Sequence, residues 1–180
     1  TDGLVVKGTL ALAGDPANTV LRGTVAGPGS IVAAENSGAT FDAVTLSTIP
    51  LTVRGQVRVT GGMTLQGAKV TLLGDTAGAD RRLEFAGSQA LAGTGEVVFS
   101  GTASRNLVLA SGGALTVGSG ITVHGGPGII GEDPAAAGTD SHLVVAGRIV
   151  ADAGGEEILV SADSVVNHGT LGAVGGGSLR

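Results

Sequence analysis

Two stretches of this 180-residue sequence repeat one pattern of short apolar runs that end in glycine: Leu51-Thr-Val-Arg-Gly-Gln-Val-Arg-Val-Thr-Gly-Gly62 and Leu115-Thr-Val-Gly-Ser-Gly-Ile-Thr-Val-His-Gly-Gly126. Six of the twelve aligned positions are identical. Apolar and polar residues alternate within each run, and β-branched residues are frequent, which indicates short, half-buried β-strands. The glycines that follow supply the positive φ that sharp corners need.

Other parts of the chain repeat related motifs. Gly27-Pro-Gly-Ser-Ile-Val32 matches Gly93-Thr-Gly-Glu-Val-Val98, and the offset between these two is nearly the same as that between Leu51 and Leu115. The two offsets predict units of three coils, each of about 21–22 residues, with two or three short strands per coil. Further copies of a Gly-x-Gly-x-aliphatic motif lie at 126–130 and 175–179, and a Leu-x-x-x-Gly motif occurs at 4–8, 83–87 and 143–147.

The repeats predict an all-β fold, a single-stranded parallel β-helix (β-solenoid) of about eight irregular coils that spans residues 1–180 as one domain. With a spacing of about 4.8 Å between coils, the rod would be roughly 40 Å long. A β-sandwich is the alternative, since it also has many short strands. It does not by itself produce a long repeat with the same turn motif in register. The chain is expected to be a fragment of a longer repeat protein.

The composition indicates an aliphatic core. Leu, Ile, Val and Phe make up 50 of the 180 residues, too many for a disordered chain despite 34 Gly and 5 Pro. Trp and Tyr are absent, and the only aromatic residues are Phe41, Phe85 and Phe99. A narrow interior with little room for aromatic rings accounts for this scarcity.

Charge and composition also exclude several functions. The net charge of −5 is scattered, with no basic stripe and no aromatic platform for nucleic acid. No apolar stretch is long enough to insert into a membrane as a helix. The absence of Cys removes disulfides and thiolate metal sites, and it suits a large secreted bacterial protein.

One segment, Glu156–His168, has two interpretations. Its apolar residues match a helical stripe, with acidic residues at the start and His168-Gly169 at the end. The other interpretation is two strands, Ile158–Val160 and Val165–Asn167, joined by an Ala-Asp-Ser corner. The strands are favoured, because the surrounding sequence is all strand and β-branched residues are frequent here.

Several passages resemble the Gly-rich repeats of large bacterial extracellular proteins, namely filamentous-haemagglutinin-like adhesins and autotransporter passenger regions. These passages are Gly38-Ala-Thr-Phe-Asp-Ala-Val-Thr-Leu46, Leu91-Ala-Gly-Thr-Gly-Glu-Val-Val-Phe99, Ile121-Thr-Val-His-Gly-Gly126 and Val166-Asn-His-Gly-Thr-Leu171. The resemblance implies a right-handed parallel β-helix, export to the cell surface or beyond, and a structural or adhesive role. It implies no catalytic residues.

The three histidines are the first candidates for a site. His124, His142 and His168 could bind a metal if coils of about 20 residues brought them to one face. Their spacings of 18 and 26 are unequal, and His124 aligns with Thr60 at an outward position of the repeat. Ordinary exposed histidines are therefore expected.

Charged and small residues give four weaker candidates. Asp80-Arg81-Arg82-Leu83-Glu84 resembles the acids and bases that β-helix lyases or hydrolases use, but a solvated strand entrance explains it as well. Asp42 and Asp133 could bind Ca²⁺, but the tandem Asp-containing repeat is missing. Strands follow the Gly-x-Gly motifs, so turns are expected there rather than a phosphate cradle. Threonines occur singly and show no Thr-x-Thr register of the kind an ice-binding array would need.

The sequence thus predicts no catalytic, cofactor-binding or metal-binding residues. The predicted function is that of a non-catalytic structural or adhesive segment, such as a stalk, spacer or fibre element, in a bacterial secreted or surface protein. The alternative is a carbohydrate-binding or carbohydrate-active β-helix. Neither end looks like a polar cap, so the stack would continue in the same chain or associate end to end. A host or matrix ligand is expected to contact the exposed sheet faces or loops such as Glu132–Asp140.

Overall fold

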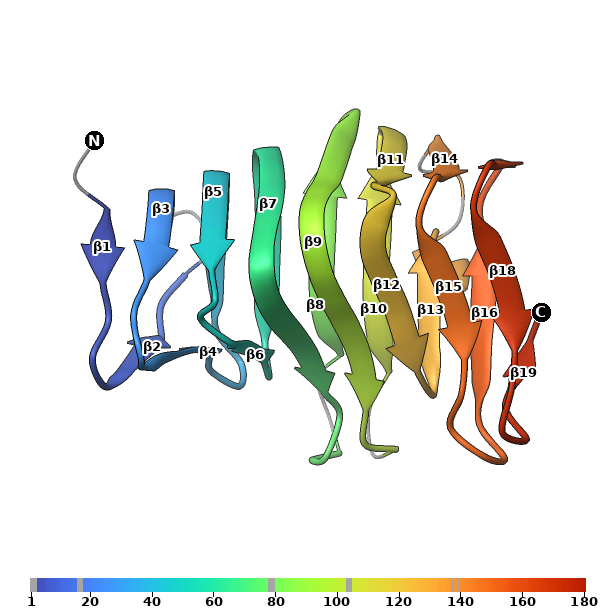
Figure 1. The fold of residues 1–180 in the computed structure, drawn as a ribbon, viewed down its shortest axis with the longest axis horizontal. Coiled ribbons are helices and arrows are strands. Elements are labelled where there is room, and N and C mark those ends of the chain that lie inside the picture. Colours follow the sequence, from blue (N-terminus) through green and yellow to red (C-terminus); the bar gives the residue numbers. More distant parts are fainter. Residues whose placement is uncertain (1–2, 16–17, 78–79, 103–104, 137, 139) are drawn as a thin grey trace.

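Parallel strands stack on one another along the long axis of the molecule (Figure 1). The structure is a computed structural model that describes residues 3–15, 18–77, 80–102, 105–136, 138 and 140–180. Every pairing between its named strands is parallel, and one isolated antiparallel bridge joins Gly14 to Gly38. This is the predicted β-solenoid and excludes a β-sandwich, in which the strands would be antiparallel.

The pairings sort the strands into three faces, which we call A, B and C. Face A contains β2 (Thr9–Leu12), β4 (Ser30–Ala33), β6 (Leu51–Val53), the ends of β7 (Gln56–Leu73) and β9 (Gln89–Ser100), β12 (Gly120–Gly125), β15 (Arg148–Ala151) and β18 (Thr170–Ala173). Face B contains the starts of β3 (Val20–Ala26), β5 (Gly38–Ser47) and β7, then β8 (Arg81–Ala86), β10 (Asn106–Ser111), β13 (Gly128–Gly131), β16 (Glu157–Ser161) and β19 (Ser178–Leu179). Face C contains β1 (Leu4–Val5), the ends of β3 and β5, the middle of β7, the start of β9, β11 (Gly113–Val117), β14 (Ser141–Val145) and β17 (Ser164–Asn167).

Single strands bend from one face to the next at residues with positive φ. Strand β7 crosses all three faces and turns at Gly61-Gly62, with φ of 76° and 85°, and again at Gly67, with φ of 68°. A side chain at these positions would be strained, because L-residues rarely adopt φ above zero. Strand β5 turns from face B to face C at Ala43, whose φ is 52°, and the pairing register shifts there.

One inward column of face A shows how many turns the chain makes. Each residue of the column pairs with the next, from Leu10 at one end to Leu171 at the other. The chain makes about seven turns, one fewer than expected. Coils differ in length, since the turn from Leu51 to Val70 uses a shorter stretch of chain than the turn from Val70 to Val97. At about 4.8 Å per turn the stack is about 34 Å high. The complete column is Leu10, Ile31, Leu51, Val70, Val97, Val123, Ile149 and Leu171.

The register confirms one sequence repeat and corrects the other. Ile31 and Val97, which occupy equivalent places in the repeated Gly-x-Gly motif, lie in the same column three steps apart. Leu51 and Leu115 begin the longer repeated stretch but lie on faces A and C, so this repeat is not the structural one. On every face, a coil contributes a half-buried strand that is followed by a corner. Similar sequences can therefore form strands on different faces, as Leu51 and Leu115 show.

Two further predictions can be compared with the structure. Residues 156–168 form strands β16 and β17 with a short corner between them, so the strand interpretation is confirmed.

All three phenylalanines are buried in the core, with Phe41 and Phe85 fully inaccessible. The interior therefore does accommodate aromatic rings, because small residues lie beside them. The ring of Phe99 occupies the space that a Cβ at Gly128 would need.

This packing predicts the effect of adding one methyl group. Gly128→Ala is expected to lower the free energy of unfolding by about 1–3 kcal/mol, because the Phe99 ring would have to move within a closed core. Gly8→Ala is the matched control, since nothing lies within 4 Å of its Cβ position. It should leave the stability unchanged or raise it by up to about 1 kcal/mol. Denaturant unfolding measures both, and equal effects would contradict the packing.

Candidate functional site

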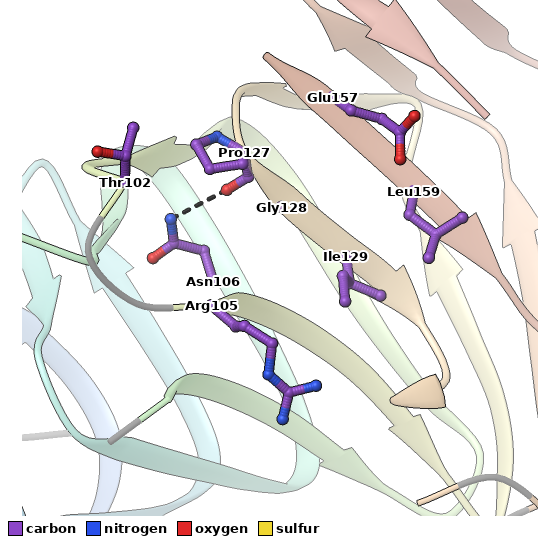
Figure 2. Close-up of a pocket in the computed structure, with 8 residues that line it drawn as sticks. All are labelled: Thr102, Arg105, Asn106, Pro127, Gly128, Ile129, Glu157 and Leu159. Carbon is purple, nitrogen blue, oxygen red and sulfur yellow. Dashed lines mark hydrogen bonds between the residues drawn. The ribbon is translucent and has the colours of Figure 1, made fainter. Parts of the chain in front are cut away.

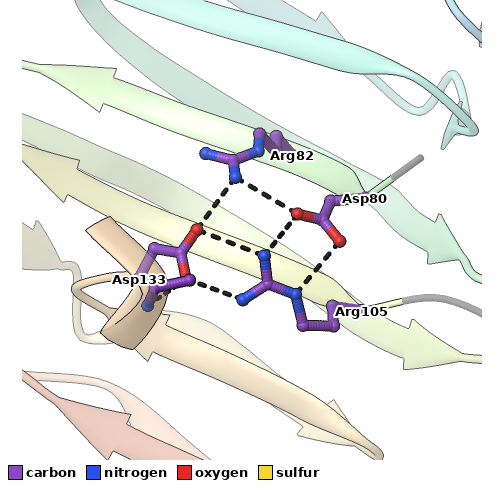
Figure 3. Close-up of polar contacts among 5 residues, drawn as sticks. Asp80, Arg82, Arg105 and Asp133 are labelled. Carbon is purple, nitrogen blue, oxygen red and sulfur yellow. Dashed lines mark hydrogen bonds and ion pairs between the residues drawn. The ribbon is translucent and has the colours of Figure 1, made fainter. Parts of the chain in front are cut away.

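Four charged side chains converge on the outer surface of face B (Figure 3). We call Asp80, Arg82, Arg105 and Asp133 the Asp–Arg cluster. The Arg105 guanidinium donates to Asp80 at 2.6 and 3.1 Å and to Asp133 at 2.7 Å. Arg82 donates to the same two carboxylates, at 3.2 Å to Asp80 and 2.8 Å to Asp133. Successive coils thus supply one closed ring of two cations and two anions.

Contacts within the Asp–Arg cluster shift the pKa values of two of its members, Asp133 and Arg105. The Asp133 side chain is only 5% exposed, and this burial acts to raise its pKa. The hydrogen bonds from Arg105 and from the Ala135 backbone N–H outweigh burial, so the pKa of Asp133 lies below its usual range. Hydrogen bonds to Asp80 and then Asp133 raise the pKa of Arg105. Each of the two arginines thus contacts both carboxylates of the cluster.

The segment that carries Asp133 lies over strand β10. Leu107 and Leu109 point outward by the alternation of β10, but Leu107 is 0% and Leu109 5% exposed. Asp133 directly precedes the short 3-10 helix η1 (Pro134–Ala136), and it lines the same small hollow as Ala136 and Leu109. The Asp–Arg cluster therefore fastens a loop over apolar side chains that face away from the core.

A hollow of about 390 Å³ lies next to the cluster, between β10, β13 and β16 (Figure 2). Apolar side chains, including Ile129 and Leu159, form one wall, and Arg105 and Glu157 lie at its edges. Asn106 lines its base and is 1% exposed. Its Nδ2 donates to the backbone oxygens of Pro127 at 3.0 Å and Ser100 at 3.2 Å, whereas its Oδ1 has no hydrogen-bond partner.

The sequence cluster 80–84 is divided by the fold. Asp80 and Arg82 join the Asp–Arg cluster, whereas Glu84 pairs with Arg58 at 2.8 Å. Arg81 points inward, is 1% exposed, and donates to the backbone oxygen of Leu73 at 3.0 Å. Arg105 comes from the next coil and was not a candidate in the sequence, because only the coil register brings it beside Asp80. The two carboxylates that lie close together in the Asp–Arg cluster, Asp80 and Asp133, are both paired with arginines.

The three histidines are not brought together. His124 lies on face A and His142 on face C, and His168 follows β17 at a corner. His124 is in the outward column of Thr71 and Val98, not in that of Thr60, which pairs with Asp42 on face B. His142 contacts Ser164 at 2.8 Å through Nδ1. Among the described residues, no group of three or more His, Asp or Glu side chains is arranged to hold a metal ion.

His124 nevertheless lies in a charged ladder across successive coils. Its Nε2 is 3.1 Å from Glu96 in the preceding coil, and its Nδ1 is 3.0 Å from Asp152 in the following coil. Each ring nitrogen of His124 thus contacts one carboxylate. Lys69 extends the ladder by pairing with Glu96 at 3.2 Å. Hydrogen bonds from His124 and then Lys69 hold the pKa of Glu96 below its usual range.

The remaining candidates have structural partners. Asp42 pairs with Arg22 at 2.7 Å and is remote in the register from Asp133, so the two do not form one Ca²⁺ site. The Gly-x-Gly motifs at 27–29 and 93–95 lead into face A strands, as expected for turns. The register does stack Thr24, Thr45 and Thr64 in one outward column of face C, which the sequence analysis missed. The column has one Thr per strand and continues with Ala92.

Comparisons with known proteins add no assignment to this geometry. No family model, no curated protein and no solved structure matches the chain. In the described part of the chain, no helix has the length and apolar character needed to cross a membrane.

The buried position of Asp133 predicts a pH-dependent loss of stability. Because its pKa is lowered by folding, ionised Asp133 contributes stability above its unfolded-state pKa, and this is lost as the pH falls through the lower folded-state pKa. Asp133→Asn should therefore cost about 1–3 kcal/mol at neutral pH, with the difference shrinking below about pH 4. Asp42→Asn, in an exposed pair, should cost less than about 1 kcal/mol. Unfolding curves from pH 2 to 8 test this, and equal losses at the two sites would contradict it.

The ladder on face A predicts how two substitutions change the pKa of one carboxyl group. His124→Asn and Lys69→Met should each raise the pKa of Glu96, since hydrogen bonds from His124 and then from Lys69 lower it. NMR titration of the Glu96 side-chain carboxyl in the three proteins measures this. An unchanged pKa of Glu96 in His124→Asn would contradict the His124 contact, and an unchanged pKa in Lys69→Met would contradict the Lys69 contact.

Proposed function

We propose that this chain is a non-catalytic structural segment, a stalk, spacer or fibre element, of a bacterial secreted or surface protein. The observation that carries the proposal is that many charged side chains of the lateral surface form ion pairs between neighbouring coils. Arg22 pairs with Asp42, Arg58 with Glu84 and Lys69 with Glu96, and in each pair the two residues are direct register partners on neighbouring coils. Arg54 and Asp75, also from neighbouring coils, form a fourth ion pair at 2.9 Å.

The mechanical role follows from the direction of the bonds. Backbone hydrogen bonds between parallel strands point along the stack, so three ladders share any load along the long axis. Each exposed ion pair contributes only about 0.2–1 kcal/mol, but the pairs recur from coil to coil. An inward column of aliphatic side chains adds burial at every step. Stiffness is therefore a property of the whole stack rather than of one site.

The setting is inferred from the sequence. The resemblance to filamentous-haemagglutinin-like adhesins and autotransporter passenger regions supports a place at the cell surface or outside the cell. The lack of Cys agrees with it. A host or matrix ligand would contact the exposed faces or the segment around Glu132–Asp140.

One observation favours the second candidate, a carbohydrate-binding or carbohydrate-active β-helix. The hollow beside Arg105 is concave and combines an apolar wall with a cation and with the carboxylate of Glu157. Against it, Arg105 already pairs with two carboxylates, and no Trp or Tyr is available to stack on a sugar ring. The structural role explains ion pairs on several coils, whereas the carbohydrate function would explain only the hollow beside Arg105.

A combined binding and turnover screen separates the two candidates. The chain is incubated with neutral and acidic polysaccharides to detect depolymerisation, and a glycan array detects binding. We expect neither activity. Binding or turnover that Arg105→Ala abolishes, and that the exposed-site control Arg22→Ala retains, would overturn the structural role and support the carbohydrate function.

A further inference from the structure

One corner of the solenoid is much longer than the same corner in the neighbouring coils. The register places Gly131 and His142 at its two sides, with residues 132–141 between them. The equivalent corner takes only residues 110–113 in the preceding coil and residues 162–163 in the following coil. A coil can therefore be closed here by a much shorter segment, and the extra length of this corner serves another purpose.

The extra segment folds back over face B (Figure 3). We call residues 132–136 the strap. Asp133 and Ala136 of the strap line one hollow together with Leu109, which points outward from β10 but is only 5% exposed. None of the three residues of η1 is buried, so this part of the strap adds no side chain to the core. The strap thus covers an apolar surface without being part of the core beneath it.

Polar contacts that converge on Asp133 hold the strap in place. The Asp133 carboxylate accepts hydrogen bonds from Arg105 at 2.7 Å and from Arg82 at 2.8 Å, which ties the strap to two earlier coils. It also accepts from the backbone N–H of Ala135 at 3.0 Å, which fixes the turn that follows. Both arginines have Asp80 as a second partner, so neither is left as an unpaired charge when the strap detaches.

We propose that the strap is a detachable cover, which opens over Leu109 when Asp133 loses its negative charge. Burial acts to raise the pKa of Asp133, but the hydrogen bonds from Arg105 and Ala135 hold this pKa below its usual range. Because folding lowers the pKa, the ionised carboxylate favours the closed strap, and this preference is lost as the pH falls through the folded-state value. Opening therefore requires a pH below about 4.

The surroundings of Asp133 leave its contacts with arginine as the main link to the body of the stack. Glu84 lines the same hollow and pairs with Arg58 at 2.8 Å. Glu132 accepts from the backbone N–H of Gly138 at 2.6 Å, within the same corner. The charged side chains around Asp133 come from the two earlier coils and from the strap itself, and they are Asp80, Arg82, Glu84, Arg105 and Glu132.

Opening of the strap changes the surface that face B presents. Leu107, Ile129 and Leu159 form one outward column on three successive coils, and Ile129 and Leu159 are half-buried. Leu109 lies two residues beyond Leu107 on the same strand. Removal of the strap joins Leu109 to this column and makes a larger apolar patch. The strap belongs to the fold itself, so the proposal stands with either candidate function.

NMR tests the role of the Asp133 charge. In Asp133→Asn at neutral pH, the Ala135 amide should exchange at least about tenfold faster, since a hydrogen bond to a charged group is worth that factor. A soluble gadolinium chelate should broaden the Leu109 methyl signals in this variant but not in the wild type. The wild type should change in the same way, and reversibly, below about pH 4. Asp42→Asn, which removes an exposed carboxylate paired with Arg22 at 2.7 Å, is the matched control and should behave like the wild type.

A shortened corner tests whether the strap is separable from the fold. In this variant Ala-Ser-Gly, the sequence of 110–112 in the preceding coil, replaces residues 132–140. It should fold and show broadened Leu109 methyl signals at neutral pH, and it decides the question if Asp133→Asn does not fold. Failure of the shortened corner to fold would overturn the proposal, because the long corner would then be needed to close the coil. Wild-type exchange and methyl signals in Asp133→Asn would also overturn it, because the strap would not depend on the charge.

Discussion

The parallel backbone ladder between successive coils is the constraint on which the rest of this structure depends. Each coil has to bring the chain back to a point one strand spacing, about 4.8 Å, along the axis from where it started. Inward residues are then forced to stack on inward residues, as Leu51 does on Val70. Variation in coil length is confined to the corners. The longer coils contain the segments 74–80, 101–105 and 132–140, while the strands they connect keep their register.

The same constraint explains how the interior and the surface are filled. The register determines which inward residues of neighbouring coils pack against one another. The Phe99 ring therefore needs small residues beside it, and Gly125 and Gly128 are those residues. On the outside, a charged residue always faces the same neighbours in the coils before and after it. Glu96 therefore meets both Lys69 and His124, and Asp80 meets Arg105. These charged side chains form contacts along the stack because the ladder places them opposite one another in neighbouring coils.

Much of the fold could be predicted from the sequence, and the part that could not has a clear physical reason. Alternation showed which residues point inward, and glycine showed where strands end, so strands at 158–160 and 165–167 were recognised against a helical pattern. Alternation does not show to which of three faces a strand belongs. Leu51–Gly62 and Leu115–Gly126 were therefore aligned although their first strands lie on different faces. The Asp–Arg cluster and the His124 ladder were missed for the same reason, since their members meet only through the register. The inward position of Arg81, in a run that otherwise reads as exposed, depends on the backbone oxygens it reaches at the corner.

The coil register is most directly tested by spin-label distances along one outward column of face A. The chain has no Cys, so labels can be attached cleanly to introduced pairs. With one label at Ala11 and the second at Thr71, Val98 or His124, the account predicts backbone separations that grow by about 4.8 Å per coil, close to 14, 19 and 24 Å. Distances that do not increase in this order, or that scatter without regular increments, would contradict the stacked register.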